Sequence, residues 1–309
     1  MSRGAKRFSQ FAGLVLGLLL ALELVCRAGA DGLAAVAHRV HFKLALLRAH
    51  GPVDFVSLGS SRSNDGIAPG QLGLGSGFAA STPSTSLPTL EYFAAHLGAQ
   101  KLVLVEVSRP TFAPTPMDDV APPANPEAFQ KDPVGEWLST HSALLQRRRA
   151  FALENLPRVF ALAFASRFDG SEWFRSRQLV ETFRDEAPPP DVHDDEAWKP
   201  AAADASALVL DDDAQRVLAG YERVVASLRA SGAKVVLTAP PLGLGWRAEE
   251  CGPAQNALRA EVARRTQAPL LDFTCAEVSE AWFLEGQHLS SPGRARYSKA
   301  LGDALRALP

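Results

Sequence analysis

The sequence predicts an α/β protein with a mostly parallel sheet that helices cover on both faces. Short apolar runs typical of buried strands alternate with longer segments of helical periodicity. The 309 residues are enough to bury a full core. Hydrophobic residues make up 47% and charged residues 21%, which excludes a disordered chain. The net charge of −2 argues against nucleic acid as a partner, because phosphate binding needs a concentrated positive field.

The N-terminal segment predicts export from the cytoplasm. Three basic residues precede an apolar run over 11–26, which is typical of an export signal. Residues 1–30 are either a signal peptide cut before Asp31 or an uncleaved anchor. The anchor is possible because the segment is long enough for a membrane-spanning helix, which needs ~20 residues. We favour the anchor, a transmembrane helix whose short basic side stays in the cytoplasm. Residues 31–50 are expected to continue as a juxtamembrane helix.

The main domain is expected over 51–309. Its first part contains two strands with a helix between them. The apolar run 53–58 ends in a Gly-Ser turn, which indicates a buried strand. Helical spacing follows over 89–97. Branched apolar residues over 101–107 form the clearest strand in the chain.

An insertion is expected at about 110–206. This stretch opens with a proline-rich segment, has helical patterns at 134–165 and 171–184, and contains no convincing strand. Ligands of open α/β sheets bind at the carboxyl ends of strands, so an insertion leaving such an end can wall or cover a site. A passive decoration is the alternative.

The last part of the domain repeats the alternation. Helical periodicity over 213–230 ends at Ser-Gly, and the acidic run 211–213 is expected to cap that helix through its dipole, a metal role being the lesser alternative. The remaining elements are a strand at 234–239 stopped by two prolines, a helix at 251–266, a strand at 269–273 and an amphipathic helix at 294–308.

Three cysteines bear on the compartment. Cys26 lies in the apolar N-terminal run, whereas Cys251 and Cys275 belong to the exported part. An oxidising compartment permits a disulfide between these two, and two unpaired buried thiols are the alternative. No Cys/His spacing resembles a zinc site, and the sequence implies neither a metal nor a cofactor.

Two segments carry the candidate chemistry. Gly59–Arg62 follows the first strand of the domain, and a serine on a tight turn there is exposed beside backbone N–H groups. That setting suits a nucleophile with an oxyanion hole. Near the C-terminus, Glu285 stands three residues before His288, on a loop that precedes the last helix. A carboxylate so placed can orient an imidazole and stabilise its charged form.

In this order, the two segments resemble the SGNH/GDSL hydrolase superfamily. They look most like its membrane-anchored, envelope-facing branches, whose first block reads Gly-Ser-Ser-Arg in place of Gly-Asp-Ser. The resemblance covers roughly 53–308 without the insertion, and it implies a three-layer α/β/α sandwich of flavodoxin-like architecture. It also implies that Ser61 is the nucleophile, His288 the general base and Glu285 the acid of the triad, where the family usually has aspartate.

The oxyanion hole departs from the family pattern. Ser84 stands near the place of the second-block glycine, and a serine can still donate its backbone N–H. The third-block asparagine is missing, because the chain reads Glu-Val-Ser-Arg over 106–109. Losing one oxyanion donor costs ~10²–10³ in rate. Arg62, Asn64 and Arg109 are the candidates to replace it or to bind substrate.

The sequence therefore predicts a serine esterase or O-acyltransferase outside the cytoplasm, held to the cell membrane by its N-terminal helix. Its expected substrate is an acylated envelope glycan or lipid. One alternative is a catalytically inactive SGNH-like module that binds a glycan or an assembly partner in the envelope. The other is an unrelated α/β fold in which the serine and histidine motifs are coincidental.

Overall fold

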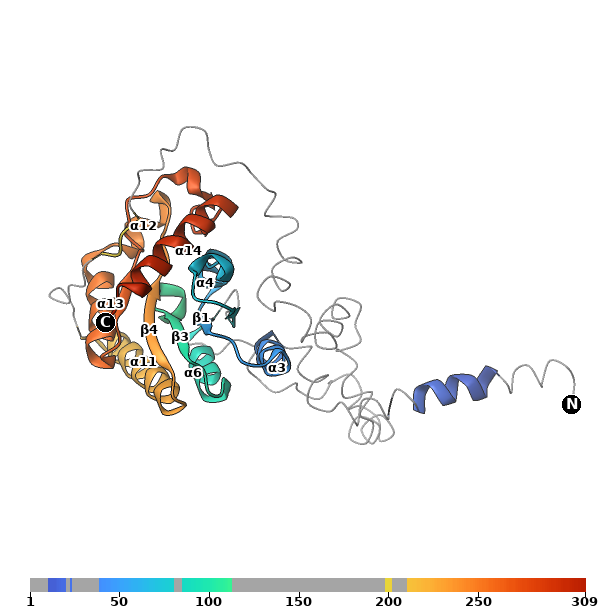
Figure 1. Cartoon of the computed structure of the whole chain (residues 1–309). Coiled ribbons are helices and arrows are strands. Elements are labelled where there is room, and N and C mark those ends of the chain that lie inside the picture. Colours follow the sequence, from blue (N-terminus) through green and yellow to red (C-terminus); the bar gives the residue numbers. More distant parts are fainter. Residues whose placement is uncertain (1–10, 21–22, 24–38, 81–84, 113–197, 202–209) are drawn as a thin grey trace, which may run out of the picture. The chain divides into compact units, whose positions relative to one another are not determined.

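The computed structural model describes residues 11–20, 23, 39–80, 85–112, 198–201 and 210–309 (Figure 1). The chain divides into two compact units, one made of residues 1–45 and 121–164, the other of 46–120 and 165–309. In the first unit, 11–20 are helical, and α3 (Arg39–His50) begins there within the predicted juxtamembrane segment. No helix in the described ranges is long and apolar enough to cross a membrane. Most of the predicted anchor, 1–30, lies outside them.

The second unit is built on a five-stranded parallel sheet of order β2-β1-β3-β4-β5. An antiparallel hairpin, β6–β7, forms a separate two-stranded sheet. The central strands consist mostly of Val, Leu and Ala, as expected where helices cover both faces of a parallel sheet. The strands are β1 (Phe55–Leu58), β2 (Gly77–Ala79), β3 (Leu102–Glu106), β4 (Lys234–Ala239), β5 (Leu270–Asp272), β6 (Phe283–Glu285) and β7 (His288–Leu289).

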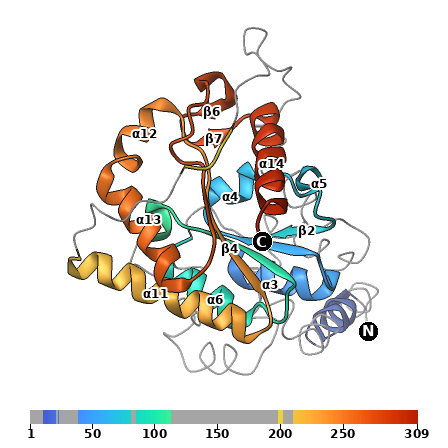
Figure 2. The same cartoon turned by 60° about the vertical axis from the view of Figure 1, so that its left-hand side comes forward.

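Helices connect the strands and cover the sheet. Figure 2 shows α4, α5 and α14 on one side of the sheet and α6 and α11 on the other, with α13 packed against α11. Strands and helices thus alternate, as an α/β fold requires. The helices are α4 (Ser61–Gly66), α5 (Pro69–Leu72), α6 (Leu87–His96), α11 (Asp212–Ala230), α12 (Leu244–Glu250), α13 (Pro253–Thr266) and α14 (Ser291–Arg306), with short 3₁₀ turns at Arg109–Phe112 and Glu280–Trp282.

The core under α14 follows the two-residue period of the strands. Phe55, Leu104 and Val236, one from each of three neighbouring strands, form one cluster with Tyr297 and Leu301 of α14. All five side chains are fully buried. This packing fixes the C-terminal helix directly over β1, the strand that leads to Ser61.

The predicted parallel α/β architecture is present, and several further elements were not predicted. The helix expected over 251–266 is α13, which starts two residues later because Gly252 is extended and Pro253 is its first residue, while α12 before it was missed. Proline suits a first helical turn but cannot continue a helix through it. Asp211 caps α11 as expected, accepting a hydrogen bond from the Ala214 N–H at 2.7 Å. The helices predicted inside the insertion lie outside the described residues.

The contact between α6 and α11 generates a stability prediction. A Cβ at Gly220 of α11 would lie 2.3 Å from Leu87 Cδ2, whereas a Cβ at Gly245 of α12 would meet nothing within 4 Å. Overpacking costs about 1–3 kcal/mol, while Gly→Ala in a helix gains about 1 kcal/mol. We expect Gly220→Ala to lower the free energy of unfolding and Gly245→Ala to raise it. Urea denaturation measures both, and a more stable Gly220→Ala protein would contradict this packing.

Candidate active site

The candidate site lies where the winding of the sheet reverses. The two neighbours of β1 are β2 and β3, and the connections leaving toward them run over opposite faces of the sheet. Ligands of doubly wound folds bind in the crevice that such a reversal opens at the carboxyl ends of the strands. Gly59 and Ser60 leave β1 at this end, and Ser60 caps α4 by accepting a hydrogen bond from the Arg62 N–H at 3.2 Å.

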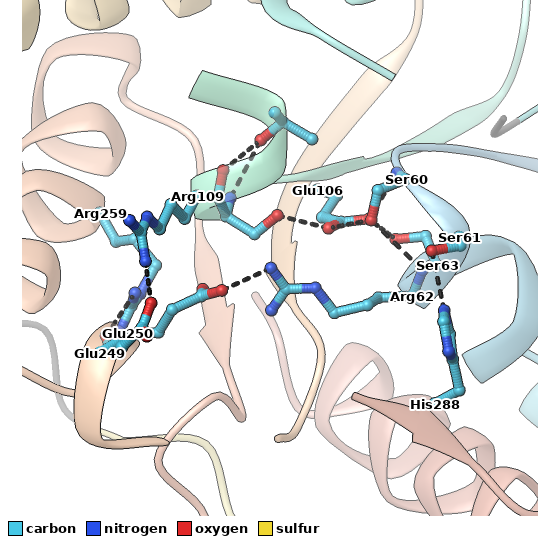
Figure 3. A network of polar contacts seen from close by, with 12 residues as sticks. Ser60, Ser61, Arg62, Ser63, Glu106, Arg109, Glu249, Glu250, Arg259 and His288 are labelled. Atoms are coloured by element: carbon cyan, nitrogen blue, oxygen red, sulfur yellow. Dashed lines mark hydrogen bonds and ion pairs between the residues drawn. The ribbon is translucent and has the colours of Figure 1, made fainter. Parts of the chain in front are cut away.

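Ser61 and His288 meet at this point, although 227 residues separate them in the chain. Ser61 Oγ lies 2.9 Å from His288 Nε2 (Figure 3). Ser61 is the first residue of α4, His288 is the first of β7, and these two elements pack together. Both residues are partly buried. When Nε2 is unprotonated, the serine hydroxyl donates to it, which is the arrangement of a nucleophile with its general base.

Two further groups bear on this pair. The backbone of Glu285 is opposite His288 in the β6–β7 ladder, while the side chain of Glu285 lies outside the description. The N–H of Ser61 has no acceptor among the described residues. The first N–H groups of a helix lack partners within it. This one is therefore available to an oxyanion that forms on a carbonyl attacked by Ser61.

A buried carboxylate holds the serine turn in place. Glu106, at the end of β3, is fully buried and accepts from the Ser60 N–H at 2.7 Å, the Ser60 hydroxyl at 2.7 Å and the Ser63 hydroxyl at 2.6 Å. The Ser108 hydroxyl is a fourth donor. A Cβ at Gly59 would lie 2.4 Å from Glu106 Oε2, so only glycine leaves room for the carboxylate. Glu106 thereby fixes the backbone on both sides of the α4 N-cap.

Tyr221 supports the other end of Glu106. Its hydroxyl donates to the Glu106 carbonyl at 2.7 Å and is also hydrogen bonded to the Thr111 hydroxyl at 2.6 Å. Burial raises the pKa of Tyr221 far above its usual value; the Glu106 charge adds to the rise and the Thr111 hydrogen bond opposes it. Tyr221 therefore remains a neutral donor at any physiological pH.

The side chain of Arg62 points into the protein, away from the candidate catalytic pair. Its side chain is 2% exposed, and Nη2 binds Glu250 Oε1 at 2.6 Å. The structure thus places this guanidinium in a buried ion pair rather than on the open face of the site. Arg62 Nε and Nη1 are buried and have no hydrogen-bond partner within the part of the chain that the structure describes.

A disulfide anchors the partner of Arg62. Cys251 and Cys275 are joined, with 5.6 Å between their Cα atoms, and Cys251 directly follows Glu250. Arg259, fully buried, binds Asp272 Oδ2 at 2.6 Å and donates to the Glu250 carbonyl at 3.1 Å. The end of α12 is therefore tied to α13 and to the loop after β5.

The other predicted oxyanion or substrate residues are scattered. Asn64 is buried within α4, and Arg109 forms an exposed ion pair with Glu249. Ser84 lies outside the described residues. Ser108 lies in 106–109, where the family pattern has its third block. Its hydroxyl donates a hydrogen bond to Glu106.

Glu106 and Glu250 were not among the site residues predicted from the sequence. A carboxylate at the end of the apolar run 101–107 was the available signal for Glu106, because a buried charge needs nearby donors. Nothing in the sequence pairs Glu250 with Arg62, which lies 188 residues away.

A separate groove of about 1110 Å³ lies along α14, lined in part by Trp198, Trp282 and Arg296. It includes neither Ser61 nor His288. Among the described residues, no group of His, Cys, Asp and Glu side chains could hold a metal ion.

Comparisons with known proteins add no family to this description. No protein-family model matches the chain, and no curated protein sequence matches it significantly.

The Glu106 network generates a second prediction. Glu106→Gln replaces one acceptor oxygen with a donor that faces hydroxyls and an N–H, so buried groups lose their partner at about 1–3 kcal/mol. We expect a lower unfolding free energy and slower turnover by the Ser61 site, although Glu106 does not contact Ser61 Oγ. The exposed Glu277 gives the matched control Glu277→Gln. Unchanged stability and activity in Glu106→Gln would show that the network is dispensable.

The disulfide generates a third prediction. It closes a loop of 24 residues, which the chain-entropy model values at ~3 kcal/mol. We expect non-reducing mass spectrometry to find Cys251 and Cys275 blocked, and a reductant to lower the free energy of unfolding by that amount. The double variant Cys251→Ser/Cys275→Ser should match the reduced protein and be insensitive to reductant. Alkylatable thiols at both positions in the exported protein would contradict the pairing.

Proposed function

We propose that this protein is a serine esterase or O-acyltransferase that acts outside the cytoplasm on an acylated envelope glycan or lipid. The observation that carries the proposal is the 2.9 Å hydrogen bond between Ser61 Oγ and His288 Nε2. A serine and a histidine from opposite ends of a domain, in hydrogen-bond contact where parallel strands end, form the minimal unit of nucleophilic acyl transfer. An SGNH-type three-layer sandwich is part of this proposal, supported by the strand order and by helices on both faces.

The proposed reaction has two stages. Ser61 Oγ attacks the ester carbonyl while its proton passes to His288 Nε2, and the Ser61 N–H stabilises the oxyanion. The ester C–O bond then breaks, and the leaving alcohol takes the proton from His288. In the second stage His288 removes a proton from water or a sugar hydroxyl, whose oxygen attacks the acyl-serine carbonyl. The bond between the acyl carbon and Ser61 Oγ then breaks, and His288 returns the proton to Ser61 Oγ. Glu285 is the proposed acid that orients His288.

A catalytically inactive binding module is the second candidate. The absence of the third-block asparagine from 106–109 favours it, because the Ser108 hydroxyl is occupied by Glu106. Labelling by a fluorophosphonate separates the two candidates, since only an activated Ser61 reacts with it.

Substitution of the pair is the fourth prediction. We expect hydrolysis of p-nitrophenyl acetate, with kcat falling at least about 10³-fold in Ser61→Ala and in His288→Ala. The double variant should be no worse than either single one, because the two groups act as a unit. Ser231→Ala and His96→Ala, both remote from the site, are the matched controls. Wild-type turnover by Ser61→Ala would refute the serine mechanism.

The location is the fifth prediction. The proposed anchor carries its basic residues on the short N-terminal side, which the positive-inside rule keeps in the cytoplasm. A reporter fused after Pro309 should therefore be active only outside the cytoplasm and should fractionate with membranes. Full-length protein in the cytosol would contradict export, whereas a soluble form starting at Asp31 would show that the segment is cleaved.

A further inference from the structure

The ion pair between Arg62 and Glu250 ties the nucleophile turn to the end of α12. Arg62 directly follows Ser61, and Figure 3 shows its side chain reaching from α4 to Glu250. Both side chains of the pair are at most 5% exposed. Within the described part of the chain, Glu250 is the one hydrogen-bond partner of this guanidinium. A buried charge that loses its partner is strongly disfavoured, so a displacement of Glu250 would also displace Arg62.

The helix that carries Glu250 lies at the surface. Glu250 is the one buried side chain of α12 among those that the structure describes. Backbone contacts hold the first part of the helix: the Gly243 N–H donates to the Gly286 carbonyl at 2.7 Å, and Arg247 donates to the Val278 carbonyl at 2.5 Å. These contacts do not involve the disulfide, so they would persist when it is broken.

The last turn of α12 is held covalently. The Cys251–Cys275 disulfide begins at the residue after Glu250 and crosses to the loop after β5. Three noncovalent contacts also reach this turn: Arg259 to the Glu250 carbonyl at 3.1 Å, Asn256 to the Cys251 carbonyl at 3.2 Å, and the ion pair of Arg109 with Glu249. The ion pair is exposed and contributes little. The disulfide is therefore the strongest constraint on the position of Glu250.

The disulfide is open to a reductant. Cys251 and Cys275 are both partly exposed, and Arg259 Nη2 lies 3.8 Å from Cys275 Sγ. A guanidinium there favours the thiolate that a thiol–disulfide exchange releases. A dithiol supplies two electrons and two protons: the S–S bond breaks, both cysteines become thiols, and the dithiol closes into its own disulfide.

We infer that Glu250 is a positioning residue for the nucleophile, and that the Cys251–Cys275 disulfide makes this positioning depend on oxidation. On reduction the last turn of α12 is released, Glu250 and Arg62 move together, and the nucleophile loses its alignment with the base. The inference rests on the proposed function and adds its regulation. An enzyme built in this way reaches full activity only in an oxidising compartment, where the disulfide forms.

Reduction of the folded protein tests the coupling. The rate of Ser61 labelling by a fluorophosphonate and the kcat for p-nitrophenyl acetate are compared with and without dithiothreitol, at a temperature where circular dichroism shows both forms folded. We expect reduction to lower both about tenfold and to leave KM almost unchanged, because a misplaced nucleophile slows the chemistry without removing a binding group. Cys251→Ser/Cys275→Ser should show the same loss without reductant. Unchanged rates in the reduced, folded protein would overturn the inference.

A variant without the ion pair tests the route. Arg62→Met/Glu250→Met replaces both charges by uncharged side chains of similar length. Reduction should then change the labelling rate less than about twofold, because the two halves of the route are no longer coupled. The matched control Arg223→Met/Glu91→Met removes the exposed ion pair between α11 and α6 and should keep the full response to reductant. A full response in Arg62→Met/Glu250→Met would overturn the inference.

Hydrogen exchange separates this inference from the proposed function, because it needs no substrate. Reduction should raise the exchange of the amides in 61–66 at least about tenfold and leave those of β3 unchanged. That result without labelling or ester hydrolysis would retain the coupling and reject the esterase. Hydrolysis by Ser61 with no effect of reduction on rate or exchange would retain the esterase and reject the coupling. An equal rise in β3 would show general loosening and also reject the coupling.

Discussion

The geometry of the candidate site depends on the buried carboxylate of Glu106. A charge without solvent costs several kcal/mol unless donors satisfy it. Here the donors are the Ser60 N–H and three hydroxyls, two of them from the serine turn itself. No described ion pair includes Glu106, so moving the turn away would leave the carboxylate without three of its partners. Glu106 lies at the end of β3, which pairs with β1. Its hydrogen bonds therefore fix the first turn of α4 relative to these two strands.

The second half of the site is fixed by α14. The Ser290 hydroxyl caps this helix by accepting from the Gly293 N–H at 3.3 Å, while the Ser290 N–H binds the Trp282 carbonyl at 2.8 Å. A Cβ at Gly293 would lie 2.2 Å from the same carbonyl, so this approach requires glycine. Because α14 also packs over β1 through Tyr297, the packing of the core fixes the position of His288 relative to β1.

The elements that local pattern defines could be predicted from the sequence. The apolar runs that become β1, β3, β4 and β5 each stand out, and the predicted strand 234–239 has the observed bounds. β2 escaped prediction because its three residues, Gly77–Ala79, are too few to show a period. The hairpin and α12 escaped because tertiary contacts at Gly243 and Gly286, rather than propensity, hold them.

The site shows the same division between local and long-range information. Serine after a strand and histidine before the last helix are local signals, and their meeting follows from the packing of α14 over β1. The pairing of Arg62 with Glu250 depends on where α12 ends, which no local pattern encodes. For that reason the sequence suggested Arg62 as an oxyanion or substrate residue, whereas its charge is buried in an ion pair.

The missing third-block asparagine is not a strong argument against catalysis, although the family pattern usually contains it. One lost oxyanion donor lowers the rate by ~10²–10³, against accelerations of at least ~10⁶ that enzymes reach. A site that keeps the proposed nucleophile, the proposed base and the Ser61 N–H, which has no acceptor among the described residues, would thus be slow rather than inert. Loss of the nucleophile or the base removes far more, because the two work as a unit. Under the proposed mechanism, activity therefore depends on the contact between Ser61 and His288, and Glu106 and α14 hold that contact from opposite sides.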